Sequence, residues 1–150
     1  MAQNFPPRQG QGNYGGRNDR DNNPKIDTSE IQLKDIKADL FDRIAQQTAV
    51  TIADNKNSNK PSQLRRFYDE IVMWEGKVSQ FPEKFDEYLP FIRMINAKAA
   101  YALGRKLVDD NFVTLINVSL KQVNDVSTMR HFKLFMEAFM GFYKEKRPKD

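Results

Sequence analysis

Apolar residues recur at helical spacing in successive segments between Thr28 and Lys146, and this periodicity is the feature that most constrains the fold. No stretch shows strand alternation, and no hairpin signal occurs. The sequence therefore predicts an all-α protein, a compact bundle of about five helices with a disordered N-terminal tail. The expected helices cover residues 28–53, 61–79, 89–108, 109–123 and 128–146, and a short helical turn covers 81–88.

The central predicted helix, Leu89–Val108, combines small residues with one basic edge. Pro90 suits the first turn of a helix, and Gly104 lies near the other end. Four alanines between them leave room for neighbouring helices to approach closely. Lys98, Tyr101 and Arg105 follow at i, i+3 and i+7 and so share a stripe. No acidic residue occurs between Glu87 and Asp109, so the stripe places two cations beside an aromatic ring.

A second window without acidic residues runs from Asn55 to Tyr68, between Asp54 and Asp69. Its cations are Lys56, Lys60, Arg65 and Arg66. Two interpretations stay open. Arg65 and Arg66 can pair with Asp69 and Glu70 at i, i+4, where each pair contributes about 0.3 to 0.5 kcal/mol. Alternatively, they contact RNA.

The net charge of +4 comes from the two ends of the chain. Residues 1–26 hold four basic and two acidic residues, and residues 144–150 again hold four and two. Residues 27–143 are neutral, with 16 of each sign. A nucleic-acid surface on the folded part must therefore come from segregation of charge rather than from excess.

Composition divides the chain into a tail at 1–26, a helical domain at 27–146 and a basic C-terminal tail at 147–150. The first segment is rich in Gly, Asn and Arg and cannot bury enough surface to order itself. Its stretch from Gly12 to Arg17 is similar to tails that touch RNA loosely, or it only solubilises the protein. No signal peptide and no long apolar run is present, so we expect a cytoplasmic protein without a membrane partner.

The last predicted helix carries a wide aromatic and methionine face, including Phe132, Phe135, Phe139 and Tyr143. Such a face either forms the core or covers a neighbouring subunit.

Residues that would support catalysis or bind a cofactor are scarce in this sequence. There is no cysteine, and His131 is the single histidine. A thiolate metal site, a cysteine nucleophile and a two-histidine metal site are therefore excluded within one chain. Phosphate-binding, zinc-protease and serine-hydrolase motifs do not occur. We expect a non-enzymatic protein with no catalytic residue, metal or cofactor.

Three stretches carry a resemblance to a known family. They are Ser-Gln-Leu-Arg-Arg-Phe-Tyr-Asp-Glu-Ile from Ser62, Asn-Ala-Lys-Ala-Ala-Tyr-Ala-Leu-Gly-Arg from Asn96, and the aromatic run from Phe132. In this order they resemble the small subunit of the type III-A CRISPR effector, the Csm complex, over roughly residues 60–145. Pro61 departs from the pattern, since a small hydroxyl residue is common there, and the N-terminal extension is not required by the family.

The resemblance implies an RNA-binding small subunit of an antiviral ribonucleoprotein, present in several copies. It would contact guide RNA and target RNA and assemble with the backbone repeat subunit and the large subunit, which carry the catalytic activities. Residues matched to the two motifs are Gln63, Arg65, Lys98, Tyr101 and Arg105. Flanking candidates, chosen from charge alone, are Lys60, Arg66, Arg93 and Lys106.

Two other hypotheses remain open on the sequence. One is a protein-only helical adaptor that docks through its aromatic C-terminal helix. The other is a small enzyme that requires a borrowed metal or an active site shared with another chain. The sequence also leaves open whether the two basic windows face the same groove.

Overall fold

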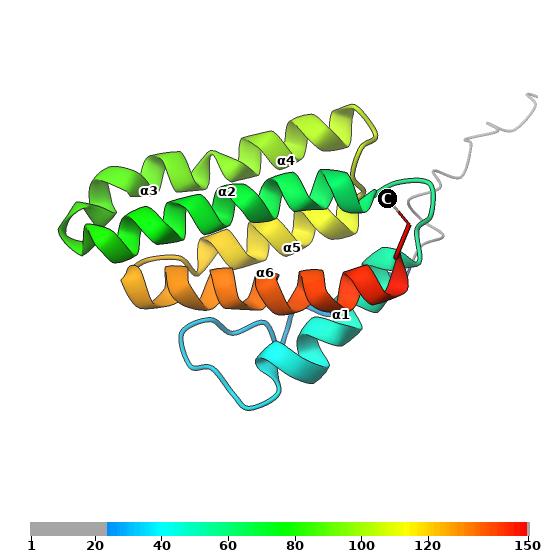
Figure 1. The fold of residues 1–150 in the computed structure, drawn as a ribbon, viewed down its shortest axis with the longest axis horizontal. Coiled ribbons are helices and arrows are strands. Elements are labelled where there is room, and N and C mark those ends of the chain that lie inside the picture. Colours follow the sequence, from blue (N-terminus) through cyan, green and yellow to red (C-terminus); the bar gives the residue numbers. More distant parts are fainter. Residues whose placement is uncertain (1–23, 150) are drawn as a thin grey trace, which may run out of the picture.

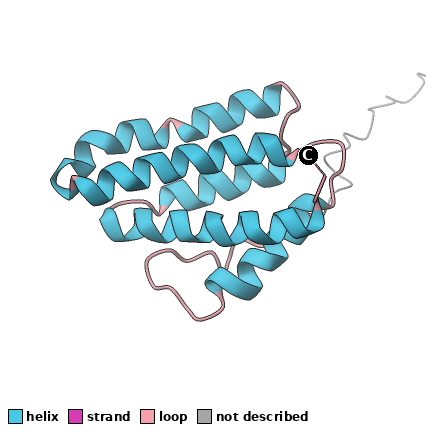
Figure 2. Cartoon of the chain, in the orientation of Figure 1, coloured by secondary structure: helices cyan, strands magenta, loops and turns pink. Residues whose placement is uncertain are grey.

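A computed structural model describes residues 24–149 of the chain, and they form an all-α bundle, as predicted (Figures 1 and 2). Predicted tail residues 1–23 lie outside the described residues. The α-helices are α1 (Ala45–Ala53), α2 (Pro61–Gln80), α3 (Phe85–Arg93), α4 (Ile95–Gly104), α5 (Asp110–Lys121) and α6 (Val126–Lys146). A π-helical turn, Leu40–Ile44, leads into α1, and a 3-10 turn, Pro82–Lys84, leads into α3.

The core lies between α6 and the helices around it. Helix α6 packs against α1 and α2, while α5 packs against α4. Phe67 of α2 meets Phe112 of α5 edge-on, with ring centroids 5.2 Å apart. In Figure 1, α3 and α4 form the upper edge of the bundle and α1 the lower edge. No helix of the described residues is long and apolar enough to cross a membrane.

The aromatic face of α6 forms the centre of this core. Phe132, Phe135, Phe139 and Tyr143 are all 0% exposed, so each ring contributes its apolar area to folding. These four rings are covered by their own chain and leave no room for a partner. The alternative of an adaptor that docks through its aromatic C-terminal helix is therefore wrong in its choice of surface.

The first predicted helix begins later than expected. Residues 24–39 form no helix, and Ile31 and Leu33, two positions apart, are both 0% exposed. Side chains of α5 and α6 satisfy this segment's backbone: the Leu33 N–H donates to Gln122 Oε1 at 2.8 Å, and Leu33 O lies 2.6 Å from His131 Nδ1. These long-range hydrogen bonds replace the intrahelical ones that the spacing predicted.

The predicted central helix is divided at Met94 into α3 and α4. Pro90 lies inside α3 and not in a first turn, so the helix loses one backbone hydrogen bond there. The chain nevertheless stays in register, because the Met94 N–H donates to Pro90 O at 3.2 Å and the Lys98 N–H donates to Met94 O at 3.1 Å. Helices α3 and α4 thus form one bent helical run.

Side-chain caps start the last two helices. Asp109 caps α5, as predicted, by accepting from the Phe112 N–H at 3.0 Å. Helix α6 begins at Val126, two residues before the predicted Thr128, because Asp125 and Thr128 form a capping box. Hydrogen bonds from the Thr128 N–H and then its hydroxyl hold the pKa of Asp125 below the ordinary value.

We expect Asp125→Ala to lower the free energy of unfolding by about 1 kcal/mol at pH 7. Because the folded pKa is lowered, the carboxylate's contribution is complete above the ordinary aspartate pKa of 3.8 and is lost as the pH falls through the folded pKa. Urea denaturation at several pH values should show that the difference in the free energy of unfolding between wild type and Asp125→Ala becomes smaller in acid. Asp125→Asn keeps a cap but has no titrating carboxylate, so its free energy of unfolding should lie close to that of wild type at pH 7 and should gain on that of wild type as the pH falls through the folded pKa of Asp125.

Asn59 joins five helix ends of the bundle. It is 0% exposed and has a left-handed backbone, with φ of 60°. Its side chain accepts from the Asp109 N–H at 2.9 Å and donates to Ile52 O at 3.4 Å. Its carbonyl oxygen accepts from the Tyr143 hydroxyl and, at 2.9 Å, from Arg147 Nη1. The ends of α1, α4 and α6 and the starts of α2 and α5 therefore meet at this residue.

Asn59→Ala should lower the free energy of unfolding by about 2 to 4 kcal/mol, since alanine disfavours the left-handed conformation and leaves the Asp109 N–H without an acceptor. Asn59→Gly loses the same side-chain bonds but adopts a positive φ freely. Chemical denaturation should therefore give the glycine variant a free energy of unfolding between those of wild type and the alanine variant. Equal free energies of unfolding in the two variants would contradict a role for backbone strain.

Candidate nucleic-acid interface

Two contacts hold α2 beside the α3–α4 run and set their register. Lys98 of α4 forms an ion pair with Glu70 of α2, and the rings of Trp74 and Phe91 stack with centroids 5.9 Å apart. The two helical runs are therefore antiparallel neighbours. Arg66 lies one turn before Glu70, and Tyr101 lies one turn after Lys98. Because the two helical runs are antiparallel, Arg66 and Tyr101 are at the same level.

The exposed and half-buried side chains along this pair of helices form one surface, which we call the α2–α4 face. Its members are Gln63, Arg66, Glu70, Met73 and Lys77 from α2, and Glu87, Phe91, Met94, Lys98, Tyr101 and Arg105 from the α3–α4 run. In each set the spacing alternates between three and four residues, so each set follows one side of its helix. The residues predicted from the two motifs lie mainly in the half near the start of α2.

Tyr101 is the most exposed large hydrophobic side chain of the described residues, at 67%. The Arg105 guanidinium lies over its ring, 5.8 Å from the centroid. This cation–π contact orients the arginine without neutralising it. An open aromatic ring and a guanidinium on the same turn can stack on a base and bind a phosphate.

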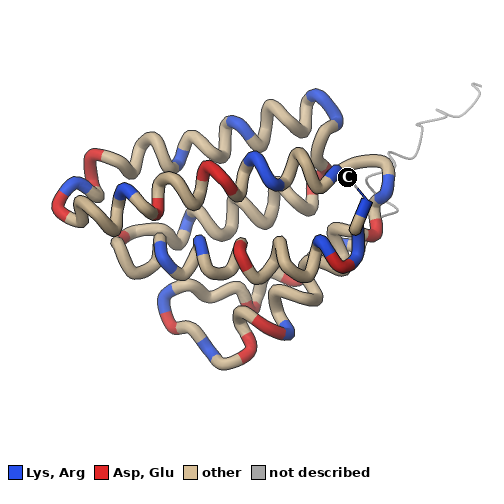
Figure 3. The backbone as a smooth tube through the Cα atoms, in the orientation of Figure 1, with Lys and Arg blue, Asp and Glu red and all other residues tan. Residues whose placement is uncertain are grey.

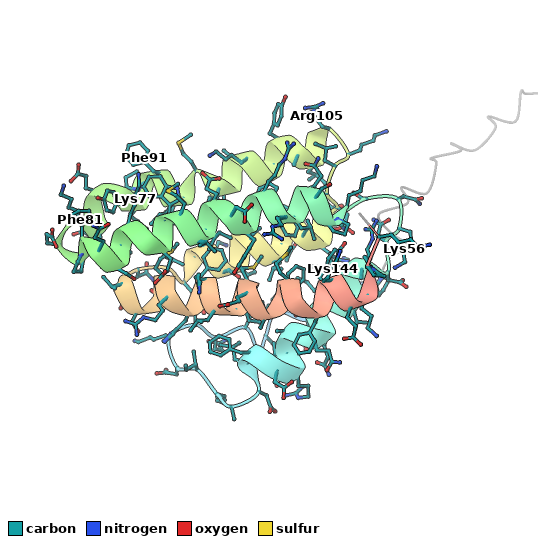
Figure 4. All side chains as sticks on the ribbon, in the orientation of Figure 1. Lys56, Lys77, Phe81, Phe91, Arg105 and Lys144 are labelled. Atoms are coloured by element: carbon teal, nitrogen blue, oxygen red, sulfur yellow. The ribbon has the colours of Figure 1, made fainter. Side chains whose placement is uncertain are left out.

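The loops at this end bring one end of each basic window together. The Asn59 N–H donates to Leu107 O at 3.0 Å, and the Ser58 hydroxyl donates to Lys106 O at 3.4 Å. Lys60 is thereby placed near Lys106. Figure 3 shows basic residues gathered here, and Figure 4 places Lys56, Arg105 and Lys144 at the same end. We call Lys56, Lys60, Arg105, Lys106, Lys144 and Lys146 the basic end.

Two acidic side chains of this region are already engaged. Glu70 binds Lys98, and Asp109 both caps α5 and accepts from Asn55 Nδ2 at 3.0 Å. Their charges are compensated by cations or helical N–H groups. Three exposed acids also lie at this end, Asp54, Asp110 and Glu145, and the six cations of the basic end outnumber them.

The predicted ion pairs of α2 are half correct. Arg65 pairs with Asp69 at 3.8 Å, as predicted at i, i+4. Arg66 does not pair with Glu70, because Lys98 from α4 takes that carboxylate. One residue is about 100° of rotation on a helix, so Arg65 projects away from the side that carries Arg66. Arg66, chosen only as a flanking candidate, is the arginine that faces the α4 residues.

Arg93 has a structural role. Its Nη2 donates to Asn124 Oδ1 at 3.2 Å and to Val123 O at 3.4 Å. These bonds tie the end of α3 to the loop between α5 and α6. The side chain is therefore drawn away from the stripe that carries Lys98, Tyr101 and Arg105.

Sequence reasoning did not select the cations at the end of α6. Lys144 and Lys146 lie in its last turn, and Arg147 Nη1 donates to Ser58 O at 2.6 Å. This bond holds the end of α6 against the loop that carries Lys56 and Lys60. The basic composition of the C-terminal residues was the available signal in the sequence. Only the long-range contact shows where these cations lie in the fold.

No group of three or more potential metal ligands occurs among residues 24–149. The arrangement offers phosphate and base contacts through cations and one ring.

Arg93→Ala should lower the free energy of unfolding by about 1 kcal/mol, since it removes hydrogen bonds between the end of α3 and the loop between α5 and α6. Arg66→Ala, an exposed change on the α2–α4 face, should stay within about 0.5 kcal/mol of wild type. Thermal and urea denaturation of both variants compare them directly. Equal stabilities would contradict the structural role of Arg93.

Comparison with known proteins gives one family. Residues 35–149 match the family model described as Csm2 Type III-A, which covers the α2–α4 face and the basic end. No curated protein and no solved structure matches the chain.

Proposed function

The chain belongs to the Csm2 Type III-A family and is thus a small subunit of the type III-A Csm complex, and on that premise we propose that it binds RNA without catalysing a reaction. Its ligands are the guide RNA and the target RNA paired with it, and its protein partners are the backbone repeat subunit and the large subunit of the cytoplasmic complex. Catalysis belongs to those partners.

One observation carries the proposal: two basic segments that are far apart in the sequence adjoin in space. Hydrogen bonds between residues 58–59 and 106–107 join the loop before α2 to the loop after α4. The cations of both loops and the neighbouring side chains Arg66 and Arg105 then border one surface. Cations gathered on one surface of a neutral domain favour binding of a polyanion. A small anionic ligand would instead need an enclosed site.

The expected mode of binding is contact with the phosphate backbone. Lysine and arginine side chains on exposed helical turns position a strand without reading its bases. Tyr101 supplies a ring that stacks on any base. Specificity for the target then comes from pairing with the guide, and the subunit responds to the shape of the paired strands.

Arg66→Ala/Arg105→Ala should weaken binding to single-stranded RNA by about tenfold at physiological salt, as two phosphate contacts are lost. If three or four phosphates are contacted, log affinity of wild type should fall with log salt at a slope of about −2 to −3, and the variant's slope should be shallower by about 1.4. Fluorescence anisotropy with a labelled RNA measures both quantities.

Lys37→Ala/Arg130→Ala is the matched control, because it removes two exposed cations outside the α2–α4 face and the basic end. It should bind RNA almost as wild type does. If the two double variants bind RNA equally tightly, also within the assembled complex, the proposed RNA surface is wrong. A native complex that survives nuclease treatment and shows no ultraviolet crosslink to RNA near Tyr101 would favour a protein-only role.

A further inference from the structure

The loop that carries Lys56 and Lys60 has little apolar packing to hold it. It joins α1 to α2, and among residues 54–60 only Asn59 is buried. A segment that buries so little side-chain surface keeps one conformation mainly through the hydrogen bonds of its backbone. The positions of both lysine side chains therefore depend on the groups that bind this backbone.

Arg147 binds the loop at three backbone carbonyls. Its Nη1 lies 2.6 Å from Ser58 O, 2.9 Å from Asn59 O and 3.4 Å from Asn55 O. Figure 1 shows the loop between α1 and α2 passing beside the end of α6, where Arg147 follows. The Asn55 and Asn59 carbonyls belong to the peptide units that lead into Lys56 and Lys60. One guanidinium thus fixes the backbone next to both lysines.

Arg147 is itself anchored by α6. Its N–H donates to Tyr143 O at 2.9 Å, and its Nη1 donates to the Tyr143 hydroxyl at 3.1 Å. The guanidinium carbon also lies 6.0 Å from the centroid of the Tyr143 ring. Because Tyr143 is 0% exposed, this arginine connects the loop to the core of the bundle.

The other side of the loop is bound to a helix end of fixed shape. At the end of α4 the Lys106 N–H donates to Leu103 O and the Leu107 N–H donates to Ala102 O, both at 2.9 Å. With Lys106 at φ of 60°, these are the two hydrogen bonds of a Schellman motif. The loop before α2 donates to the carbonyl oxygens of Lys106 and Leu107. The loop is therefore held between this motif and the side chain of Arg147.

The charge of Arg147 is directed into the protein. Its side chain is half-buried, whereas Lys56 and Lys60 are exposed. The guanidinium lies among carbonyl oxygens near the C-terminal ends of α1 and α6, whose partial negative charge favours a cation. Phosphate contacts at this loop therefore fall to the two lysines, and Arg147 acts through them.

We propose that Arg147 is a positioning residue for RNA binding, which holds loop 54–60 so that Lys56 and Lys60 meet the phosphates in one arrangement. Arg147 does not contact the RNA. This role rests on the proposed function. Ordering the loop before RNA arrives removes an entropic cost from association, which raises affinity without adding a contact.

A double-mutant cycle on the full chain tests this route. Arg147→Ala should weaken binding of a labelled single-stranded RNA about fivefold at physiological salt, because the loop must then be ordered on binding. In a Lys56→Ala/Lys60→Ala background the same change should have less than about a twofold effect, because no lysine is left to position. Fluorescence anisotropy measures all four affinities. Equal losses in the two backgrounds would mean that Arg147 contacts RNA itself, and would overturn the positioning role.

Limited digestion with trypsin tests the loop without RNA. Trypsin does not cleave before proline, and Lys60 precedes Pro61, so the cleavage site in this loop follows Lys56. Arg147→Ala should raise the rate of that cleavage about fivefold or more, because the loop opens more often. Arg93→Ala is the matched control, since it removes an arginine that donates to the Val123 carbonyl oxygen away from this loop, and it should leave the rate near that of wild type. An unchanged rate in Arg147→Ala would overturn the proposal.

The two experiments separate the possible failures, once circular dichroism has confirmed that all variants fold. A wild type that binds no RNA would overturn the proposed function, and with it any role of Arg147 in binding, whatever the digestion shows. A wild type that binds RNA, together with an Arg147→Ala variant that binds RNA as tightly, would overturn only the positioning role.

Discussion

The hydrogen bonds of Asn59 are the interaction on which the rest of this bundle depends. The residue is buried, and its side chain and carbonyl oxygen hold Ile52, Asp109, Tyr143 and Arg147. A polar residue in this position is costly unless every group is paired. Because its partners come from three separate parts of the chain, satisfying it fixes the relative positions of all the helix ends that meet there. The basic end exists as a surface only because these helix ends are held together.

Helical periodicity was enough to predict the fold class and most helix boundaries. The all-α fold, the helix from Pro61 and the Asp109 cap follow from apolar spacing, proline placement and capping chemistry, which are local properties. The aromatic face of α6 was assigned to the core or to a partner, and burial of Phe132 and its neighbours decides for the core. Local rules succeed here because the local and tertiary preferences agree.

The misassigned start of the first helix and the misassigned partners of the candidate site depend on contacts between distant residues. Nothing near Leu33 indicates that its N–H bonds to Gln122, 89 positions away, so residues 28–39 looked helical. Glu70 is four residues from Arg66, yet Lys98 from another helix takes it. In the same way, Arg93 looked like a free cation until the loop at Asn124 was in place. Sequence identified the basic windows, whereas only the packed chain shows which side of each helix they occupy.

The docked N-terminal segment also determines where the remaining chain is attached. Asn111, at the start of α5, donates to Pro24 O at 2.7 Å and accepts from the Ile26 N–H at 3.1 Å. The start of α5 adjoins the loops at Asn59, since the Asp109 N–H donates to the Asn59 side chain. The described chain therefore enters the folded domain beside the basic end.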